Sequence, residues 1–104
     1  MNLESSYESG RLTLYLSGEL DHHGARELLL QIHELLDESM PRECVMELSG
    51  LRFMDSSGIA VIVRVSQRMR ELNGRLWLEK PCGQPKRVIE TAGIDRLAPV
   101  AITR

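Results

Sequence analysis

The sequence is poor in features that would mark several classes of protein. It has two cysteines, Cys44 and Cys82, too few for a disulfide framework or a zinc site built from cysteine. Its longest unbroken apolar run, residues 59–63, falls far short of the roughly 20 residues that a membrane-spanning helix needs. The sequence does not begin with a positively charged segment followed by an apolar one, the pattern of a secretion signal. We therefore expect a cytoplasmic protein with reduced thiols, no membrane span and no secretion signal.

Aromatic residues are also scarce, at 4%, and the charges nearly cancel, since 13 basic side chains face 15 acidic ones. Residues 1–52 hold ten acidic and four basic side chains, and residues 53–104 hold five and nine. The basic residues of the second half alternate with acidic ones and have few aromatic neighbours, unlike a nucleic-acid surface. We expect no direct nucleic-acid binding. The 42% of hydrophobic residues suffices for the core of one soluble domain.

Two periods recur in the hydrophobic pattern. Leucines at every second position of residues 12–16 predict a strand with one buried face, and the turn at residues 8–10 makes it part of a hairpin. Apolar residues three and four apart in residues 25–36 predict an amphipathic helix. The expected strands are 2–7, 11–17, 44–48, 75–78 and 97–102. The expected helices are 25–39, 55–72 and 85–92.

This order of elements predicts an α/β fold in a single domain. Strands that alternate with helices favour parallel neighbours joined by right-handed crossovers, and the N-terminal hairpin adds an antiparallel edge. We expect a mixed, mostly parallel β-sheet of four to five strands with helices. Functional groups in such sheets gather where the carboxyl ends of strands meet the amino termini of helices. Residues 18–23 and 53–58 hold that position, and we expect them to lie close together.

The segment Asp55-Ser56-Ser57-Gly58 is typical of the start of a helix. A cap by Asp or Ser and close packing at Gly58 account for it without any function. A serine at a helix amino terminus can also carry a phosphate, because the backbone N–H groups and the helix dipole favour an anion. That phosphate would add about −1.5 to −2 charge beside Asp55 and repel a partner that accepts the neutral hydroxyl. On physical grounds alone, Ser56 and Ser57 are equal candidates.

Two other chemistries fit the sequence less well. A hydrolase nucleophile in a G-x-S-x-G turn would need glycine where Met54 stands. A metal site on His22 and His23 lacks a third ligand, and we expect His33 to lie off the helix face of that pair. In the hydrolase hypothesis, at most one of the two histidines could act as the base for the serine, because adjacent side chains point in different directions. We expect Asp21 to cap the first helix, and we expect neither a metal nor a cofactor.

Two segments, taken together, resemble the anti-sigma factor antagonists of the STAS domain family. They are Gly18-Glu19-Leu20-Asp21-His22-His23 and Phe53-Met54-Asp55-Ser56-Ser57-Gly58. The likeness covers nearly the whole chain, is closest to the sporulation type, and implies that residues 1–104 form one STAS domain. Many relatives continue into a further C-terminal helix, whereas this sequence stops at Arg104. A second copy could therefore cover part of the sheet, which leaves a homodimer open.

The resemblance implies a binding switch and not an enzyme. In this family the unphosphorylated antagonist binds an anti-sigma factor that is also a serine kinase, and a sigma factor is released for transcription. The kinase phosphorylates the serine directly after the motif aspartate, the modified protein dissociates, and a serine phosphatase restores it. By resemblance the phosphorylated residue is Ser56. The other expected partner-binding residues are Asp21, His22, His23, Asp55, Ser57 and Gly58.

A second candidate is a STAS accessory subunit of a membrane transporter. Its loop would bind a protein partner without a phosphorylation cycle, and the short C-terminus favours this alternative. The loop at residues 19–23, paired with two serines in the second loop, favours the sigma-factor branch. An enzyme that acts through its own serine is the third candidate.

Overall fold

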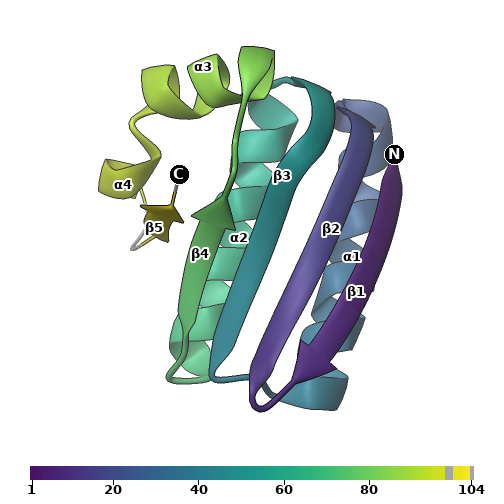
Figure 1. Cartoon of the computed structure of the whole chain (residues 1–104), viewed down its shortest axis with the longest axis vertical. Helices are drawn as coiled ribbons and strands as arrows, with labels where there is room; N and C mark the ends of the chain where they lie inside the picture. Colours follow the sequence, from purple (N-terminus) through teal and green to yellow (C-terminus); the bar gives the residue numbers. More distant parts are fainter. Residues whose placement is uncertain (98–99, 104) are drawn as a thin grey trace.

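The computed structural model describes residues 1–97 and 100–103, in which an N-terminal hairpin is followed by alternating helices and strands (Figure 1). The strands are β1 Asn2–Glu8, β2 Arg11–Leu20, β3 Glu43–Met54, β4 Arg75–Glu79 and β5 Val100–Thr103. The helices are α1 His22–Ser39, α2 Ser56–Glu71, α3 Gly83–Ala92 and α4 Ile94–Leu97.

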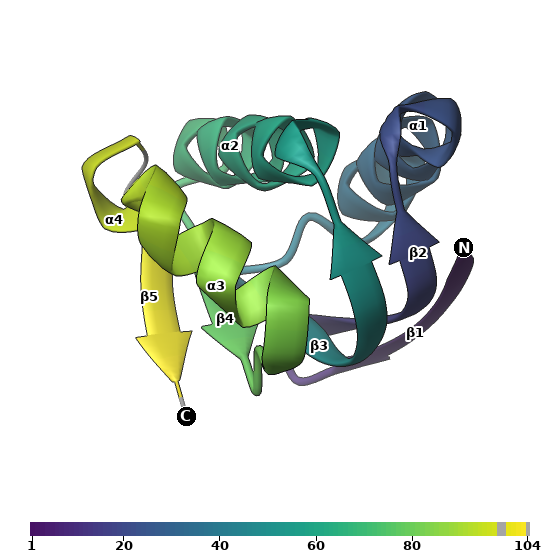
Figure 2. The same cartoon turned by 90° about the horizontal axis from the view of Figure 1, so that it is seen from above.

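The strands form one sheet in their order along the chain, β1-β2-β3-β4-β5. The β1–β2 pair is antiparallel, and the three pairs that follow are parallel. Helices α1 and α2 connect parallel strands and pack side by side on one face of the sheet (Figures 1 and 2). The predicted α/β fold, with a mixed sheet and an antiparallel edge hairpin, is therefore confirmed.

The core lies between the sheet and these two helices. Every second side chain of β2 points into it, and Leu12, Leu14 and Leu16 are almost inaccessible to solvent. The helices contribute apolar side chains at helical spacing, among them Leu28, Ile32 and Leu36 from α1 and Val61, Ile62, Val65 and Met69 from α2. Burying one such side chain stabilises the folded state by about 1.5–3 kcal/mol. The apolar contacts between the sheet and these two helices therefore account for most of the driving force for folding.

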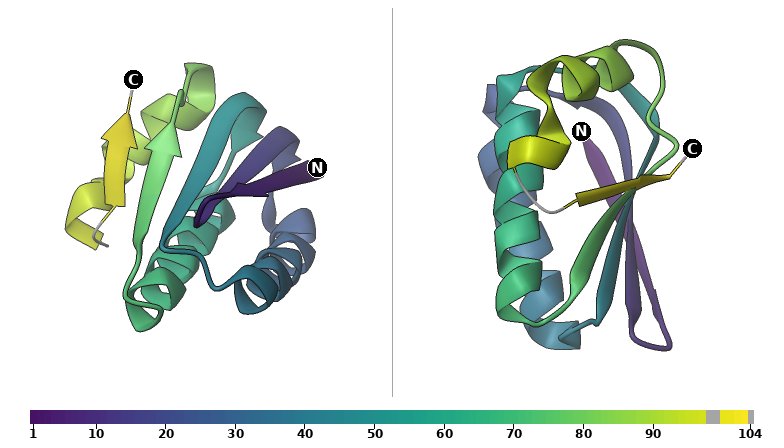
Figure 3. Two further views of the ribbon diagram at one scale, coloured as in Figure 1. Left: turned by 60° about the horizontal axis from the view of Figure 1, so that its bottom comes forward. Right: turned by 90° about the vertical axis from the view of Figure 1, so that its left-hand side faces the viewer.

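The other face of the sheet is covered by no helix of the described residues. Figure 3 shows the sheet from its edge, with α1 and α2 on one side and bare strands on the other. Helix α3 lies across the end of the sheet at which β2 and β3 finish (Figure 2). No helix within residues 1–97 is long and apolar enough to cross a membrane.

The predicted end of β3 is wrong. The turn-type residues Ser49 and Gly50 predict an end at residue 48, yet the strand continues to Met54. Gly50 pairs with Ser17 at a shift in the β2–β3 register, and a Cβ atom on residue 50 would lie 2.9 Å from Ser17 Cβ. The glycine therefore permits a close approach of two strands and does not make a turn.

The C-terminal prediction is also wrong in part. In place of a strand at residues 97–102, the structure has the short helix α4 followed by β5 at Val100–Thr103, while Ala98 and Pro99 lie outside the described residues. Gly93, which ends α3 with a φ of 62°, allows the chain to turn directly into α4. A one-turn helix is too short to give a periodic signal in the sequence.

Candidate functional site

Two aspartates cap the helices that follow β2 and β3. The Asp21 carboxylate accepts hydrogen bonds from the backbone N–H groups of His23, at 3.0 Å, and Gly24, at 3.2 Å. The Asp55 carboxylate accepts one from the N–H of Ser57 at 2.8 Å. Such caps satisfy N–H groups that a helix leaves without a partner at its amino terminus. The predicted cap at Asp21 is confirmed, and Asp55 is the residue that caps α2.

The two capped segments are in direct contact. The backbone N–H of Asp55 donates to the carbonyl of Leu20 at 3.2 Å. Just before this contact, Glu19 pairs with Phe53 and Leu20 pairs with Met54 in the parallel ladder. Of the residues expected in loops, 18–20 and 53–54 end β2 and β3, and 22–23 and 56–58 begin α1 and α2. The prediction that the two segments lie close together is confirmed.

Gly58 lets α2 begin against both strand ends. A Cβ atom on this residue would overlap Met54 Cγ, and it would lie 3.0 Å from Met54 Sδ and 3.2 Å from Leu20 Cδ2. Both side chains are fully buried, so neither can move aside without disturbing the core. Gly58 is itself buried, so it cannot contact a partner directly. Its effect on the site is to fix where Asp55, Ser56 and Ser57 lie.

Gln84 holds the end of β3, and the sequence analysis missed it. Its side-chain amide, on α3, pairs with the backbone of Met54 as a neighbouring strand would. The Met54 N–H donates to Gln84 Oε1, and Gln84 Nε2 donates to the Met54 carbonyl, both at 2.8 Å. No local pattern signals this pairing, because 30 residues separate the two partners. It ties α3 to the residue directly before Asp55.

The two candidate serines face different grooves. Ser56, the first residue of α2, is exposed and lines a groove of about 460 Å³ between α2 and α3, in which Arg87 is the charged residue. Ser57 is half-buried and lines a groove of about 490 Å³ between α1 and α2. The titratable residues of this second groove are His22, Arg26, His33 and Arg64. The structure thus distinguishes two serines that the sequence leaves equal.

The histidines are not grouped as metal ligands. His22 and His23 are exposed neighbours whose ring centroids lie 4.0 Å apart. The expectation that His33 lies off their face is wrong for His22, because eleven residues make about three helical turns and both side chains line the α1–α2 groove. Three turns also separate the two residues by about 16 Å along the axis. Within residues 1–97 and 100–103, no three metal-binding side chains come together.

Asp21 adds a fixed negative charge to the site. The hydrogen bond from the Gly24 N–H is the main reason that the pKa of Asp21 lies below its usual value. The N–H of His23 and the charges of His23 and His22 lower this pKa further. Asp21 is therefore ionised throughout the neutral range, beside a helix amino terminus that favours an anion.

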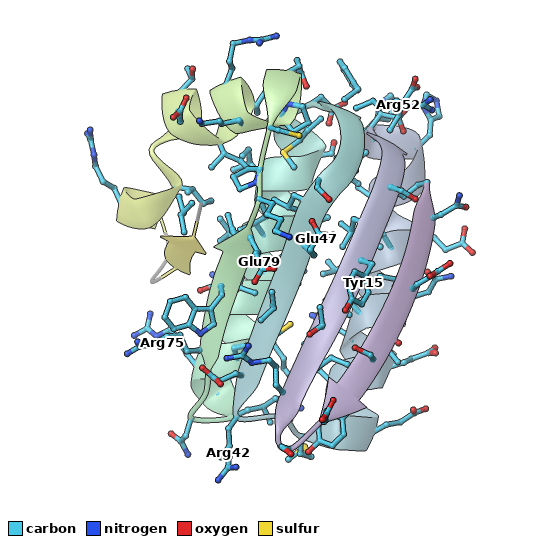
Figure 4. The ribbon with its side chains drawn as sticks, viewed as in Figure 1. Tyr15, Arg42, Glu47, Arg52, Arg75 and Glu79 are labelled. Carbon is cyan, nitrogen blue, oxygen red and sulfur yellow. The ribbon has the colours of Figure 1, made fainter. Side chains whose placement is uncertain are left out.

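An exposed aromatic side chain lies next to the capped loops. Phe53 is 40% exposed at the end of β3. Arg52, directly before it, points away from the same end of the sheet (Figure 4). Aromatic residues and arginine are enriched at protein-binding surfaces.

The chain belongs to the STAS domain family, whose model matches residues 3–103. An anti-sigma F factor antagonist of Paenibacillus polymyxa is 28% identical over 100 residues, which cover 96% of this chain and 86% of the relative. The unphosphorylated anti-sigma factor antagonist SpoIIAA has the same fold, with a TM-score of 0.82 at 20% identity over 99% of this chain and 89% of SpoIIAA. The phosphorylated form of the Bacillus cell fate determinant SpoIIAA matches with a TM-score of 0.72 at 20% identity, over 99% of this chain and 92% of that protein. The family that the two sequence segments predict is therefore confirmed.

Proposed function

We propose that the protein is an anti-sigma factor antagonist. Its unphosphorylated form binds an anti-sigma factor serine kinase and displaces a sigma factor, phosphorylation of Ser56 ends this binding, and a serine phosphatase restores it. The chain acts in the cytoplasm as a binding partner and not as an enzyme. The name of the Paenibacillus relative and the contact between the two capped segments support this proposal.

The exposure of Ser56 is the observation that carries the proposal. A kinase must bring the acceptor hydroxyl in line with the γ-phosphate of ATP, so the acceptor must be reachable. Ser56 is exposed at the first position of α2, whereas Ser57 is half-buried and its N–H is bonded to Asp55. The more accessible of the two is also the residue directly after the motif aspartate, as the resemblance implies.

A phosphate on Ser56 would change the charge of the surface more than its shape. It would add about −1.5 to −2 charge to a chain with a formal charge of −2, next to the carboxylate of Asp55. A partner surface that accepts the neutral hydroxyl would then meet concentrated negative charge. Arg87 lines the same groove as Ser56, so a basic side chain that attracts phosphate lies on the side of α3.

Phosphorylation in vitro tests the acceptor. After incubation with a cognate anti-sigma factor kinase and ATP, mass spectrometry should find one phosphate, on Ser56. Ser56→Ala should abolish the labelling, and Ser57→Ala, the matched control one position later, should keep it. Undiminished labelling of Ser56→Ala would contradict the assignment.

A binding measurement tests the switch separately. Calorimetric titration into the kinase should give a weaker complex for the phosphorylated chain than for the unmodified chain, and treatment with a serine phosphatase should restore the original affinity. Equal affinities of the two forms would show that the phosphate does not control binding.

A further inference from the structure

The groove between α1 and α2 has a continuous apolar lining. Its volume is about 490 Å³, and the two helices that form it lie side by side on one face of the sheet (Figure 2). Both helices contribute to the apolar lining, which consists of Ala25, Leu29, Leu30, Ala60 and Val61. Leu30 is 57% exposed. A single exposed leucine is ordinary, but an apolar stripe that continues across two helices is typical of a surface that a partner covers.

Among the described residues, every titratable side chain that lines this groove is basic. These side chains are His22, Arg26, His33 and Arg64. Neither arginine forms an ion pair with any residue that the structure describes. The positions three and four residues before and after each arginine, which are its neighbours on the helix surface, also hold no acidic residue. The groove therefore carries positive charge that the described part of the chain leaves without a counter-charge.

The next turn of α2 shows how such an arginine is neutralised elsewhere in the same molecule. Arg68, four residues after Arg64, donates to Asp37 Oδ1 at 2.8 Å and to Glu71 Oε1 at 3.1 Å. Asp37 belongs to α1, so this ion pair joins the two helices beyond the groove. Arg26 and Arg64 have no such acidic partner, and we infer that their carboxylates come from a second molecule.

The length of the groove fits a short helix. Its lining on α1 runs from His22 to His33, which is about three turns or 16 Å. A helix that lies in a groove between two others places apolar residues on the floor and polar residues along the rim. We propose that this groove binds an acidic amphipathic helix of the anti-sigma factor kinase, with its apolar face on Leu30 and its carboxylates on Arg26 and Arg64. The inference rests on the proposed function, whose partner it describes.

Charge complementarity selects an acidic partner. A second copy of the chain, seated groove to groove, would bring the arginines of both copies together. An acidic helix also gives the proposed switch a direct electrostatic cause. Ser57 lines the groove, and the proposed acceptor Ser56 directly precedes it. A phosphate on Ser56 would therefore add its negative charge next to the place where the carboxylates of the partner bind, and repel them.

Calorimetric titration of groove variants into the kinase tests the proposal. Arg26→Glu and Arg64→Glu should each raise the dissociation constant about tenfold or more, because each replaces an attractive contact with a repulsive one. Leu30→Ala should raise it about tenfold, since it removes apolar surface that the complex buries. Added salt should weaken the wild-type complex more than that of the double variant with Arg26→Gln and Arg64→Gln.

Two control variants repeat these changes outside the groove. Arg70→Glu reverses an exposed charge on α2, and Met40→Ala removes apolar surface from a residue that is 60% exposed at the end of α1. Both should keep the wild-type dissociation constant. Circular dichroism checks the fold of every variant, and the single changes Arg26→Gln and Arg64→Gln should still weaken binding if a charge reversal prevents folding.

A crosslink identifies the molecule that occupies the groove. With photoreactive benzoylphenylalanine in place of Leu30, mass spectrometry of the irradiated complex should find a helical kinase segment whose acidic residues flank an apolar stripe. A crosslink to a basic segment would overturn the proposal. Vesicles of phosphatidylserine and phosphatidylcholine should not bind the chain; vesicle binding that Arg26→Glu abolishes would assign the groove to a membrane instead.

The outcomes separate this inference from the proposed function. If the wild type binds the kinase and the groove variants bind it equally well, the groove is not the docking surface and the proposed function stands. If the wild type binds no kinase, both the inference and the proposed function are refuted.

Discussion

Gly58→Ala, compared with Gly24→Ala, tests whether the start of α2 depends on close packing. Each glycine is the third residue of a helix that follows an aspartate cap. Their surroundings differ. A Cβ atom on residue 58 would overlap Met54, whereas one on residue 24 would lie 3.7 Å from Met1 Cβ, an ordinary contact distance. The pair therefore isolates packing from the intrinsic preference of alanine for helices.

The two substitutions should change the free energy of unfolding in opposite directions. Replacing glycine by alanine within a helix stabilises by up to about 1 kcal/mol, and this is the whole effect expected at residue 24. Forcing an extra methyl group into a packed core costs about 1–3 kcal/mol, which exceeds the gain at residue 58. Gly58→Ala should therefore lower the free energy of unfolding by about 1–2 kcal/mol, and Tm should fall by about 5–15 °C.

Urea denaturation followed by circular dichroism measures both variants against the wild type. Gly24→Ala should have an unchanged or higher midpoint, and Gly58→Ala a lower midpoint with the same slope. If Gly58→Ala proved at least as stable as Gly24→Ala, the overlap with Met54 would not be what requires glycine, and our account of how the site is positioned would be refuted.

Three further predictions concern Gln84, Asp21 and the two thiols. Gln84→Ala should destabilise by about 1–3 kcal/mol in thermal denaturation, because it leaves the N–H and carbonyl of Met54 without partners; a change within error would show that water replaces the amide. Because the pKa of Asp21 is lowered by folding, its ionised form stabilises the fold above the usual pKa of 3.8, and this stability is lost as the pH falls through the folded pKa. The stability difference between wild type and Asp21→Asn should therefore shrink below pH 3.8, and a difference independent of pH would contradict this assignment. Burial raises the pKa of the Cys44 thiol to about 12, whereas Cys82 is exposed. Iodoacetamide should therefore alkylate Cys82 in the native chain and Cys44 only after unfolding, which mass spectrometry of the two peptides would show.

Most of the fold could be predicted because its signals are local. Alternating leucines in β2 and the helical spacing of apolar residues in α1 identify these elements without knowledge of their partners. The end of β3 could not be predicted in this way. Ser49 and Gly50 have the composition of a turn, and only the close approach of Ser17 on β2 explains why the strand continues through them.

The same distinction between local signals and contacts distant in the sequence applies to the candidate site. The caps at Asp21 and Asp55 use N–H groups two or three residues away, so the sequence indicates them. Gln84 reaches Met54 across 30 residues, and nothing near it in the sequence points there. The difference between Ser56 and Ser57 is also tertiary, because α3 lines one groove and α1 lines the other.

The way in which the site is held bears on how the proposed switch would work. The first turn of α2 is fixed by the Asp55 cap, by the packing of Gly58 on Met54, and by Gln84 on the end of β3. A phosphate added to Ser56 projects from this fixed turn, and none of these contacts involves its hydroxyl. A modification changes affinity only through a difference in interaction energy between the two states. With the backbone held in place, we expect that difference to come from the charge and size of the phosphate at the partner surface, and not from a rearrangement of the chain.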